Sequence, residues 1–176
     1  MKTLLLTLLL IFPVSQGLAQ TQSPTTKALD YFLNACWHGQ FIGSEDTDVH
    51  CYRQMVNSQF VRDNHMVNST RGKYGGETIF WWDNEKQHLN YTYWDTNGGV
   101  STGLMRKTEE GFVSPDETYE GRNGEKMVIR TRWLIMSNDK YIMESVKVDG
   151  NKTSRMFAIE YKRGPLKACP GPECDD

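Results

Sequence analysis

Five dipeptides typical of tight turns divide the chain from residue 43 onward: Gly43-Ser44, Asn97-Gly98, Asn123-Gly124, Asn138-Asp139 and Gly150-Asn151. Such residues readily adopt the positive φ angles that two-residue β-hairpin turns require. Apolar and polar residues alternate between the turns, and no helical segment separates the runs, which argues against a βαβ fold. We therefore predict an all-β chain, an antiparallel meander of about ten strands closing into a barrel.

One short helix is expected before the strands. Ser23-Pro24 is a typical helix start, with the hydroxyl as N-cap and proline at the first helical position. Leu29, Phe32 and Leu33 follow at helical spacing. An NTF2-like cone is the main alternative fold, but it needs several helices before its sheet and this chain has room for one.

The N-terminus has the pattern of a cleaved signal peptide. Lys2 is followed by an apolar run from Leu4 to Val14 and by small residues ending at Ala19. The run is shorter than the roughly 20 residues that span a bilayer, so we predict a secreted or periplasmic protein without a membrane span. The expected organisation is a signal peptide at 1–19, a leader at 20–27, a barrel domain at 28–164 and an irregular tail at 165–176.

The balance of charge makes nucleic acid a poor partner. Twenty Lys and Arg stand against 22 Asp and Glu, for a net charge of −2, and no basic cluster stands out. We expect a small-molecule partner instead, and the sequence leaves the oligomeric state open.

Four cysteines, Cys36, Cys51, Cys169 and Cys174, are expected to form disulfides in an exported protein. Three pairings exist, and we favour Cys36–Cys51 with Cys169–Cys174. A first hairpin turning at Gly43-Ser44 would place Cys36 directly opposite Cys51, within the ~4.5–5.5 Å at which cross-strand side chains meet. Neither pair has CxxC spacing, so we predict no metal site.

The same register rule applied to the last two hairpins predicts which residues face the barrel interior. A turn at Asn138-Asp139 places Glu144 opposite Trp133. A turn at Gly150-Asn151 places it opposite Phe157, with Arg155 at the diagonal. The predicted inward face of the shared strand contains Ile142, Glu144, Val146 and Val148. A buried carboxylate there needs a partner, so Glu144 is the candidate polar anchor for a ligand.

Two further turns predict other parts of the interior. A turn at Asn97-Gly98 pairs Tyr93 with Thr102 and Tyr91 with Leu104, a mixed apolar and hydroxyl face that suits a pocket wall. A turn at Asn123-Gly124 pairs Tyr119 with Val128 and Glu117 with Arg130.

The segment Ala35-Cys36-Trp37-His38-Gly39 opens the first strand and resembles the Gly-x-Trp opening of calycins, the lipocalin superfamily. The layout from Leu29 to Arg163 is most similar to small bacterial and nitrobindin-like ten-stranded members. The resemblance implies that Trp37 closes the barrel floor beneath Arg163, with Lys162 as the alternative. The family glycine is Ala35 here, and the Thr-Asp-Tyr motif of true lipocalins is absent.

The predicted inward faces, together with the resemblance, favour a lipocalin-like, non-enzymatic protein that binds a partly apolar small molecule. Its expected ligand-binding residues are Trp133, Glu144, Arg155, Tyr91 and Tyr93. One alternative is a barrel hydrolase or isomerase with Glu144 or His65 as general base. Another is a structural module whose barrel is filled with side chains.

Haem enters only through the resemblance, because nitrobindin-like barrels hold haem through a histidine. The chain has four histidines, His38, His50, His65 and His88, without a spacing typical of metal ligands. His65 lies in a strand-like stretch from Val61 to Val67 and is the histidine that we consider as facing inward. We predict no cofactor, and keep haem as an alternative.

Overall fold

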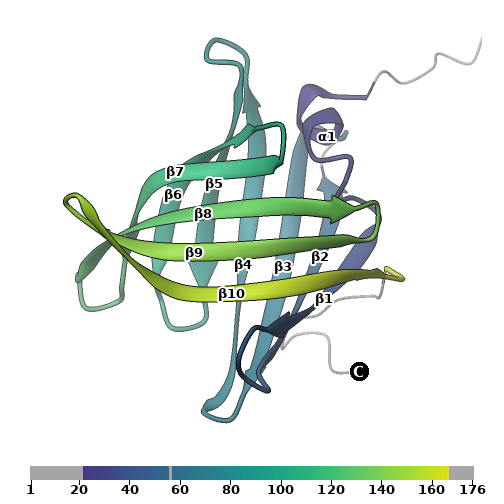
Figure 1. Ribbon diagram of the computed structural model, residues 1–176. Coiled ribbons are helices and arrows are strands. Elements are labelled where there is room, and N and C mark those ends of the chain that lie inside the picture. Colours follow the sequence, from purple (N-terminus) through teal and green to yellow (C-terminus); the bar gives the residue numbers. More distant parts are fainter. Residues whose placement is uncertain (1–21, 56, 167–176) are drawn as a thin grey trace, which may run out of the picture.

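The computed structural model describes residues 22–55 and 57–166. They form one short helix, α1 (Pro24–Ala28), and ten strands. The strands are β1 (Ala35–Phe41), β2 (Thr47–Met55), β3 (Phe60–Ser69), β4 (Gly72–Asp83), β5 (His88–Asp95), β6 (Val100–Lys107), β7 (Gly111–Glu120), β8 (Lys126–Ser137), β9 (Lys140–Asp149) and β10 (Lys152–Gly164). Each strand pairs antiparallel with its sequence neighbours, and β1 pairs with β10, so the sheet is a closed barrel (Figure 1). The predicted fold class is confirmed.

Helix α1 begins where the sequence predicts. The Ser23 hydroxyl accepts a hydrogen bond from the Thr26 backbone N–H at 3.2 Å, and Pro24 takes the first helical position. The helix ends at Ala28, earlier than the helical spacing of Leu29 and Phe32 suggested. Among the described residues, no helix is long and apolar enough to cross a membrane.

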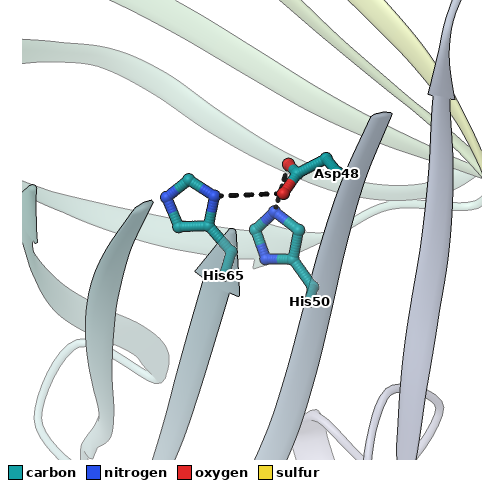
Figure 2. Close-up of side chains that lie close together, drawn as sticks. All are labelled: Asp48, His50 and His65. Atoms are coloured by element: carbon teal, nitrogen blue, oxygen red, sulfur yellow. Dashed lines mark hydrogen bonds and ion pairs between the residues drawn. The ribbon is translucent and has the colours of Figure 1, made fainter. Parts of the chain in front are cut away.

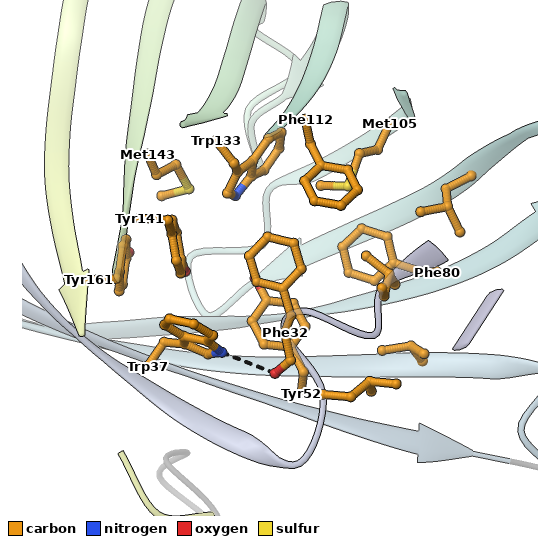
Figure 3. Close-up of a cluster of buried hydrophobic side chains, with 14 of the residues drawn as sticks. Phe32, Trp37, Tyr52, Phe80, Met105, Phe112, Trp133, Tyr141, Met143 and Tyr161 are labelled. Carbon is orange, nitrogen blue, oxygen red and sulfur yellow. Dashed lines mark hydrogen bonds between the residues drawn. The ribbon is translucent and has the colours of Figure 1, made fainter. Parts of the chain in front are cut away.

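The segment after α1 closes one end of the barrel. Leu29, Phe32 and Leu33 are fully buried, and Phe32 packs inside a cluster of aromatic rings (Figure 3). The Trp37 indole N–H donates a hydrogen bond to the Phe32 carbonyl at 3.0 Å. We call this closed end the aromatic floor, and define it by Phe32, Trp37, Tyr52, Phe112 and Tyr141.

Arg163 covers Trp37 from the last strand. Its guanidinium carbon lies 5.4 Å from the centre of the Trp37 ring, within the range of a cation–π contact. It also donates hydrogen bonds to the carbonyls of Tyr31 and Leu33 at 3.0 and 2.9 Å. Trp37 and Arg163 thus lie together at the barrel end, in the arrangement that the calycin resemblance implied.

The first hairpin has the predicted register. Cys36 pairs with Cys51 across β1 and β2 and forms a disulfide with it, which confirms this pairing. Cys169 and Cys174, and the proposed signal peptide, lie outside the described residues.

The hairpin between β8 and β9 turns at Asn138-Asp139 as predicted, but its register is not the predicted one. Ser137 pairs with Lys140, and then one extra residue, Met136, bulges out of β8. Beyond this bulge Glu144 lies opposite Arg132, not Trp133. A bulge of one residue exchanges the two faces of a strand relative to its partner, which explains the error.

A second bulge interrupts the pairing of β9 with β10. Arg155 pairs with Val146 as predicted, but Met156 is extra, so Phe157 lies opposite Ser145 and Glu144 lies opposite Ala158. The buried residues of β9 are Tyr141, Met143 and Ser145. The predicted inward face, with Ile142, Glu144, Val146 and Val148, is therefore the outer one.

The two Asn-Gly turns are three-residue loops, longer by one residue than predicted. Asp95 bonds to Gly99, and Gly121 bonds to Glu125, with Gly98 and Gly124 at positive φ. This is the turn in which a glycine in the left-handed region forms a bulge.

The predicted pairings around these two loops are therefore wrong by one position. Tyr93 lies opposite Ser101, and Tyr91 lies opposite Gly103. Tyr119 lies opposite Met127, and Glu117 lies opposite Ile129.

Candidate functional site

A cavity of about 380 Å³ lies inside the barrel above the aromatic floor. Nine of its lining side chains are aromatic, among them Trp133, Tyr91 and Tyr93. Pockets of this size with mainly apolar walls and a few polar groups are typical small-molecule sites.

One wall of the cavity carries four buried charged or titratable side chains, which we call the His–Asp cluster: Asp48 and His50 on β2, and Asp63 and His65 on β3. On each strand the two residues are separated by one position, so strand alternation points both to the same face. The register then places His50 directly opposite His65. Figure 2 shows Asp48 at the edges of both imidazole rings, in contact with each.

Asp48 is the centre of the His–Asp cluster. Its carboxylate lies 3.1 Å from His50 Nε2 and 3.3 Å from His65 Nδ1, and it accepts a hydrogen bond from the Tyr161 hydroxyl at 2.8 Å. Burial alone would raise the pKa of Asp48, but the two histidines hold it well below its ordinary value. Asp48 is therefore an ionised carboxylate inside the barrel.

His50 lies between two carboxylates. Its Nδ1 is 2.6 Å from Asp63, and its Nε2 is 3.1 Å from Asp48. Burial disfavours the charged ring, but Asp63 and Asp48 outweigh it and raise the pKa of His50 to about 10. His50 is thus an imidazolium that donates from both nitrogens at neutral pH.

His65 connects the cluster to the middle of the cavity. Its ring stacks on that of His50, with centres 4.7 Å apart and planes 13° apart. Its Nε2 shares a hydrogen bond of 3.0 Å with the hydroxyl of Tyr93. Both nitrogens of His65 therefore have protein partners.

Two histidines and an aspartate are also ligand types for transition metals. One ligand atom from each of Asp48, His50 and His65 lies within 4.8 Å of the others. In the described structure, however, the two histidines point at the Asp48 carboxylate and share its hydrogen bonds. A metal or a haem iron would have to break these contacts, so the arrangement fits a hydrogen-bonded cluster better than a metal centre.

Another acidic group lies across the barrel from the cluster. Glu117 on β7 lines the cavity, and its Oε2 atom is buried with no hydrogen-bond partner among the described residues. Burial raises the pKa of Glu117 to about 7.

The cavity has acidic but no permanently basic side chains. Asp48, Asp63, Asp95 and Glu117 line it, whereas none of the described lining residues is Lys or Arg. Of the cavity acids, Asp48, Asp63 and Asp95 have hydrogen-bond partners within the protein.

The residues proposed from sequence are divided between the two faces of the barrel. Trp133, Tyr91 and Tyr93 line the cavity. Glu144 does not: it pairs with Arg132 on the outer face, with oxygen–nitrogen distances of 2.6 and 2.7 Å. Arg155 is not in the cavity lining and borders an adjoining hollow between the β1–β2 loop, the β3–β4 loop and β10.

Sequence reasoning named His65 as a candidate base facing inward, and His65 does line the cavity, but it missed the other three members of the His–Asp cluster and Glu117. The signal for the cluster was the alternation of Asp48 with His50 and of Asp63 with His65, which places each pair on one strand face. Both faces of that hairpin carry polar groups, so alternation alone could not say which face was buried.

Fold and site together define a closed ten-stranded antiparallel barrel with an internal, acidic and aromatic cavity. Comparison of the sequence with models of known protein families and with curated proteins finds no match. The functional argument therefore depends on the geometry of the cavity.

Proposed function

We propose that this chain is an exported binding protein that encloses a small, partly apolar molecule in its barrel. The cavity carries this proposal, because its aromatic wall offers apolar surface to a ligand while the His–Asp cluster and Glu117 offer polar groups. A structural module with a filled barrel would not leave a space of about 380 Å³.

Membership of the calycin superfamily is part of the proposal. Supporting it are the closed ten-stranded meander and the contact of Arg163 with Trp37 at the barrel floor.

Export is supported by the Cys36–Cys51 disulfide, since disulfides persist in oxidising compartments. The signal-peptide pattern at 1–19 points to the same secreted or periplasmic location.

We favour binding over the rival hydrolase or isomerase. Glu144, one proposed base, lies on the outer face beside Arg132. His65, the other, lines the cavity with its Nδ1 beside Asp48 and its Nε2 beside the Tyr93 hydroxyl, so the rival reaction would depend on this residue alone.

Filling the cavity tests the proposal. The probe is N-phenyl-1-naphthylamine, a neutral apolar dye whose fluorescence rises in apolar surroundings. Ser101 on β6 is buried and lines the cavity, and its neighbour Thr102 is exposed. We expect the unmodified protein to bind the dye, Ser101→Phe to weaken binding by about tenfold or more, and Thr102→Phe to change it less than about twofold.

Circular dichroism of both variants would check that the barrel still forms. Absence of dye binding in the unmodified protein, or equal binding by a folded Ser101→Phe variant, would contradict a ligand site inside the barrel. Native mass spectrometry of freshly purified protein adds an independent readout, since a retained small molecule requires internal space.

A further inference from the structure

Glu117 points into the cavity because of an irregularity in its own strand. Between Ser114, which pairs with Thr131, and Glu117, which pairs with Ile129, strand β7 has one residue more than β8. Ser114 is fully buried, so regular alternation would turn Glu117 outward. The bulge reverses this, and bulges that redirect a side chain occur next to functional sites.

The neighbouring strands leave room for the Glu117 carboxylate. A Cβ atom at Gly103 on β6 would lie 2.9 Å from Glu117 Oε2 and 2.6 Å from the hydroxyl oxygen of Tyr91. The glycine thus lets both groups approach its backbone. The Tyr91 hydroxyl is itself bonded to Ser114 at 2.7 Å, which leaves Glu117 Oε2 without a partner.

A buried carboxylate without a partner is costly, and proteins normally pair such a group or keep it protonated. The partner does not come from the cavity wall, because no described lining residue is Lys or Arg. The one charged histidine established there, His50, is already shared by Asp48 and Asp63. A cation brought by a ligand would supply the missing partner and hold the Glu117 carboxylate in its ionised form.

The rest of the cavity favours the same kind of ligand. With Asp48 ionised and no Lys or Arg among the described lining residues, the cavity disfavours carboxylate or phosphate ligands. Aromatic rings such as Tyr91 and Trp133 provide faces that attract cations and pack against apolar groups.

We infer that the ligand is an organic amine, whose protonated nitrogen pairs with Glu117 while its apolar part contacts the aromatic wall. This inference rests on the proposed binding function and names the ligand class of the same cavity. Under this inference, Glu117 determines the preference of the cavity for a positively charged ligand.

Three probes of nearly equal shape test the charge preference. They are 1-naphthylmethylamine, a cation at neutral pH; 1-naphthylmethanol, which is neutral; and 1-naphthoic acid, an anion. Their affinities are measured by displacement of N-phenyl-1-naphthylamine and by calorimetry. We expect the amine to bind at least about tenfold more tightly than the alcohol, and the acid to bind most weakly.

Glu117→Gln keeps the shape of the side chain and removes its charge. It should fold at least as well as the unmodified protein, because it removes a buried unpaired carboxylate. We expect it to abolish the preference for the amine and to change the affinity for the alcohol less than about twofold. The matched control, Glu144→Gln on the outer face of β9, should keep the preference.

The outcomes separate this inference from the proposed function. Equal binding of the three probes, tightest binding of the acid, or an amine preference that survives in Glu117→Gln would overturn the amine inference and leave a binding barrel standing. If neither the dye nor any of the three probes binds, the proposed function fails and the inference fails with it.

Discussion

His50 lies completely inside the barrel with a carboxylate at each ring nitrogen. A buried imidazolium is costly by itself, but Asp63 and Asp48 at 2.6 and 3.1 Å stabilise the charge and each receives a hydrogen bond from it. The cluster therefore holds the charged His50 ring and the ionised Asp48 carboxylate together in the protein interior.

We predict that His50 remains protonated well above neutral pH. Its pKa in the folded protein is raised to about 10, above the ordinary 6.5. The corresponding stabilisation is fully present below pH 6.5 and is lost as the pH rises towards 10. Long-range ¹H–¹⁵N NMR of the imidazoles between pH 5.5 and 9 should show two protonated nitrogens in His50 throughout.

Loss of the His50 ring proton near pH 6.5 would contradict the assignment of a charged ring between two carboxylates. The free energy of unfolding, measured with urea across the same range, should fall at the alkaline end.

Whether a single side chain faces the cavity was predictable only where the two faces of its strand differ in polarity. Tyr91, Tyr93 and Trp133 were expected inside and line the cavity. Glu144 was expected inside because it shares a strand face with Ile142 and Val146, and this face is more apolar than the one with Ser145. In the structure the more apolar face is the outer one, so Glu144 lies outside. A barrel that holds polar groups inside does not follow the usual rule of apolar alternation.

Strands β1 and β10 show how closely the barrel elements approach one another. Gly39 on β1 lies opposite Tyr161 on β10, and an added Cβ would be 2.5 Å from the Tyr161 ring and 2.7 Å from Ile159. Only glycine leaves space for this ring, whose hydroxyl donates to Asp48.

We predict that Gly39→Ala destabilises the barrel by about 1–3 kcal/mol, as overpacking of a filled interior does. The clash should also displace Tyr161 from Asp48. Urea unfolding measures the first effect, and the Tyr161 ring signals in NMR report the second. His38→Ala, at the exposed neighbouring position, should stay within about 0.5 kcal/mol of the unmodified protein. An unaltered stability of Gly39→Ala would contradict the tight approach.

The existence of the hairpins was predictable, and their exact register was not. Turn residues and alternation are local, so the turns at Asn138-Asp139 and Gly150-Asn151 could be located from sequence. The bulges at Met136 and Met156 need only one extra residue, and both methionines are exposed, so nothing in the pattern revealed them. Both predicted hairpins selected the same wrong face of β9, because each contains one bulge that shifts its register by one residue.

At the scale of the whole molecule, the segment after α1 fills and closes one end of the barrel. Phe32 is fully buried and lies 5.0–6.1 Å, centre to centre, from the rings of Tyr52, Tyr141 and Trp37. The segment therefore separates the cavity from solvent at the end of the barrel that contains Trp37.

We predict that Phe32→Ala lowers the free energy of unfolding by about 3–5 kcal/mol, since it deletes a fully buried aromatic side chain. Urea unfolding followed by circular dichroism measures the loss. Ile42→Ala, which truncates an exposed side chain in the β1–β2 loop, is the control and should change little. A loss below about 1 kcal/mol for Phe32→Ala would mean that the floor does not depend on this ring.

The overall architecture was the most predictable level. Regular turns, alternation and the absence of helical segments indicated a ten-stranded meander, and the contact between Trp37 and Arg163 lay where the resemblance implied. The cavity was harder to predict, because it depends on bulges in β7, β8 and β10 that decide which alternate side chains turn inward.

The pairing of β1 with β10 has a consequence for synthesis. Cys36 lies opposite Gly164, so the seam of the barrel joins residues near the two ends of the described chain. Every other strand can pair with the neighbour made just before it, but this seam cannot form until β10 has left the ribosome. Until then both outer strands have unpaired edges, so a nascent chain stays open and the barrel closes only with its last strand.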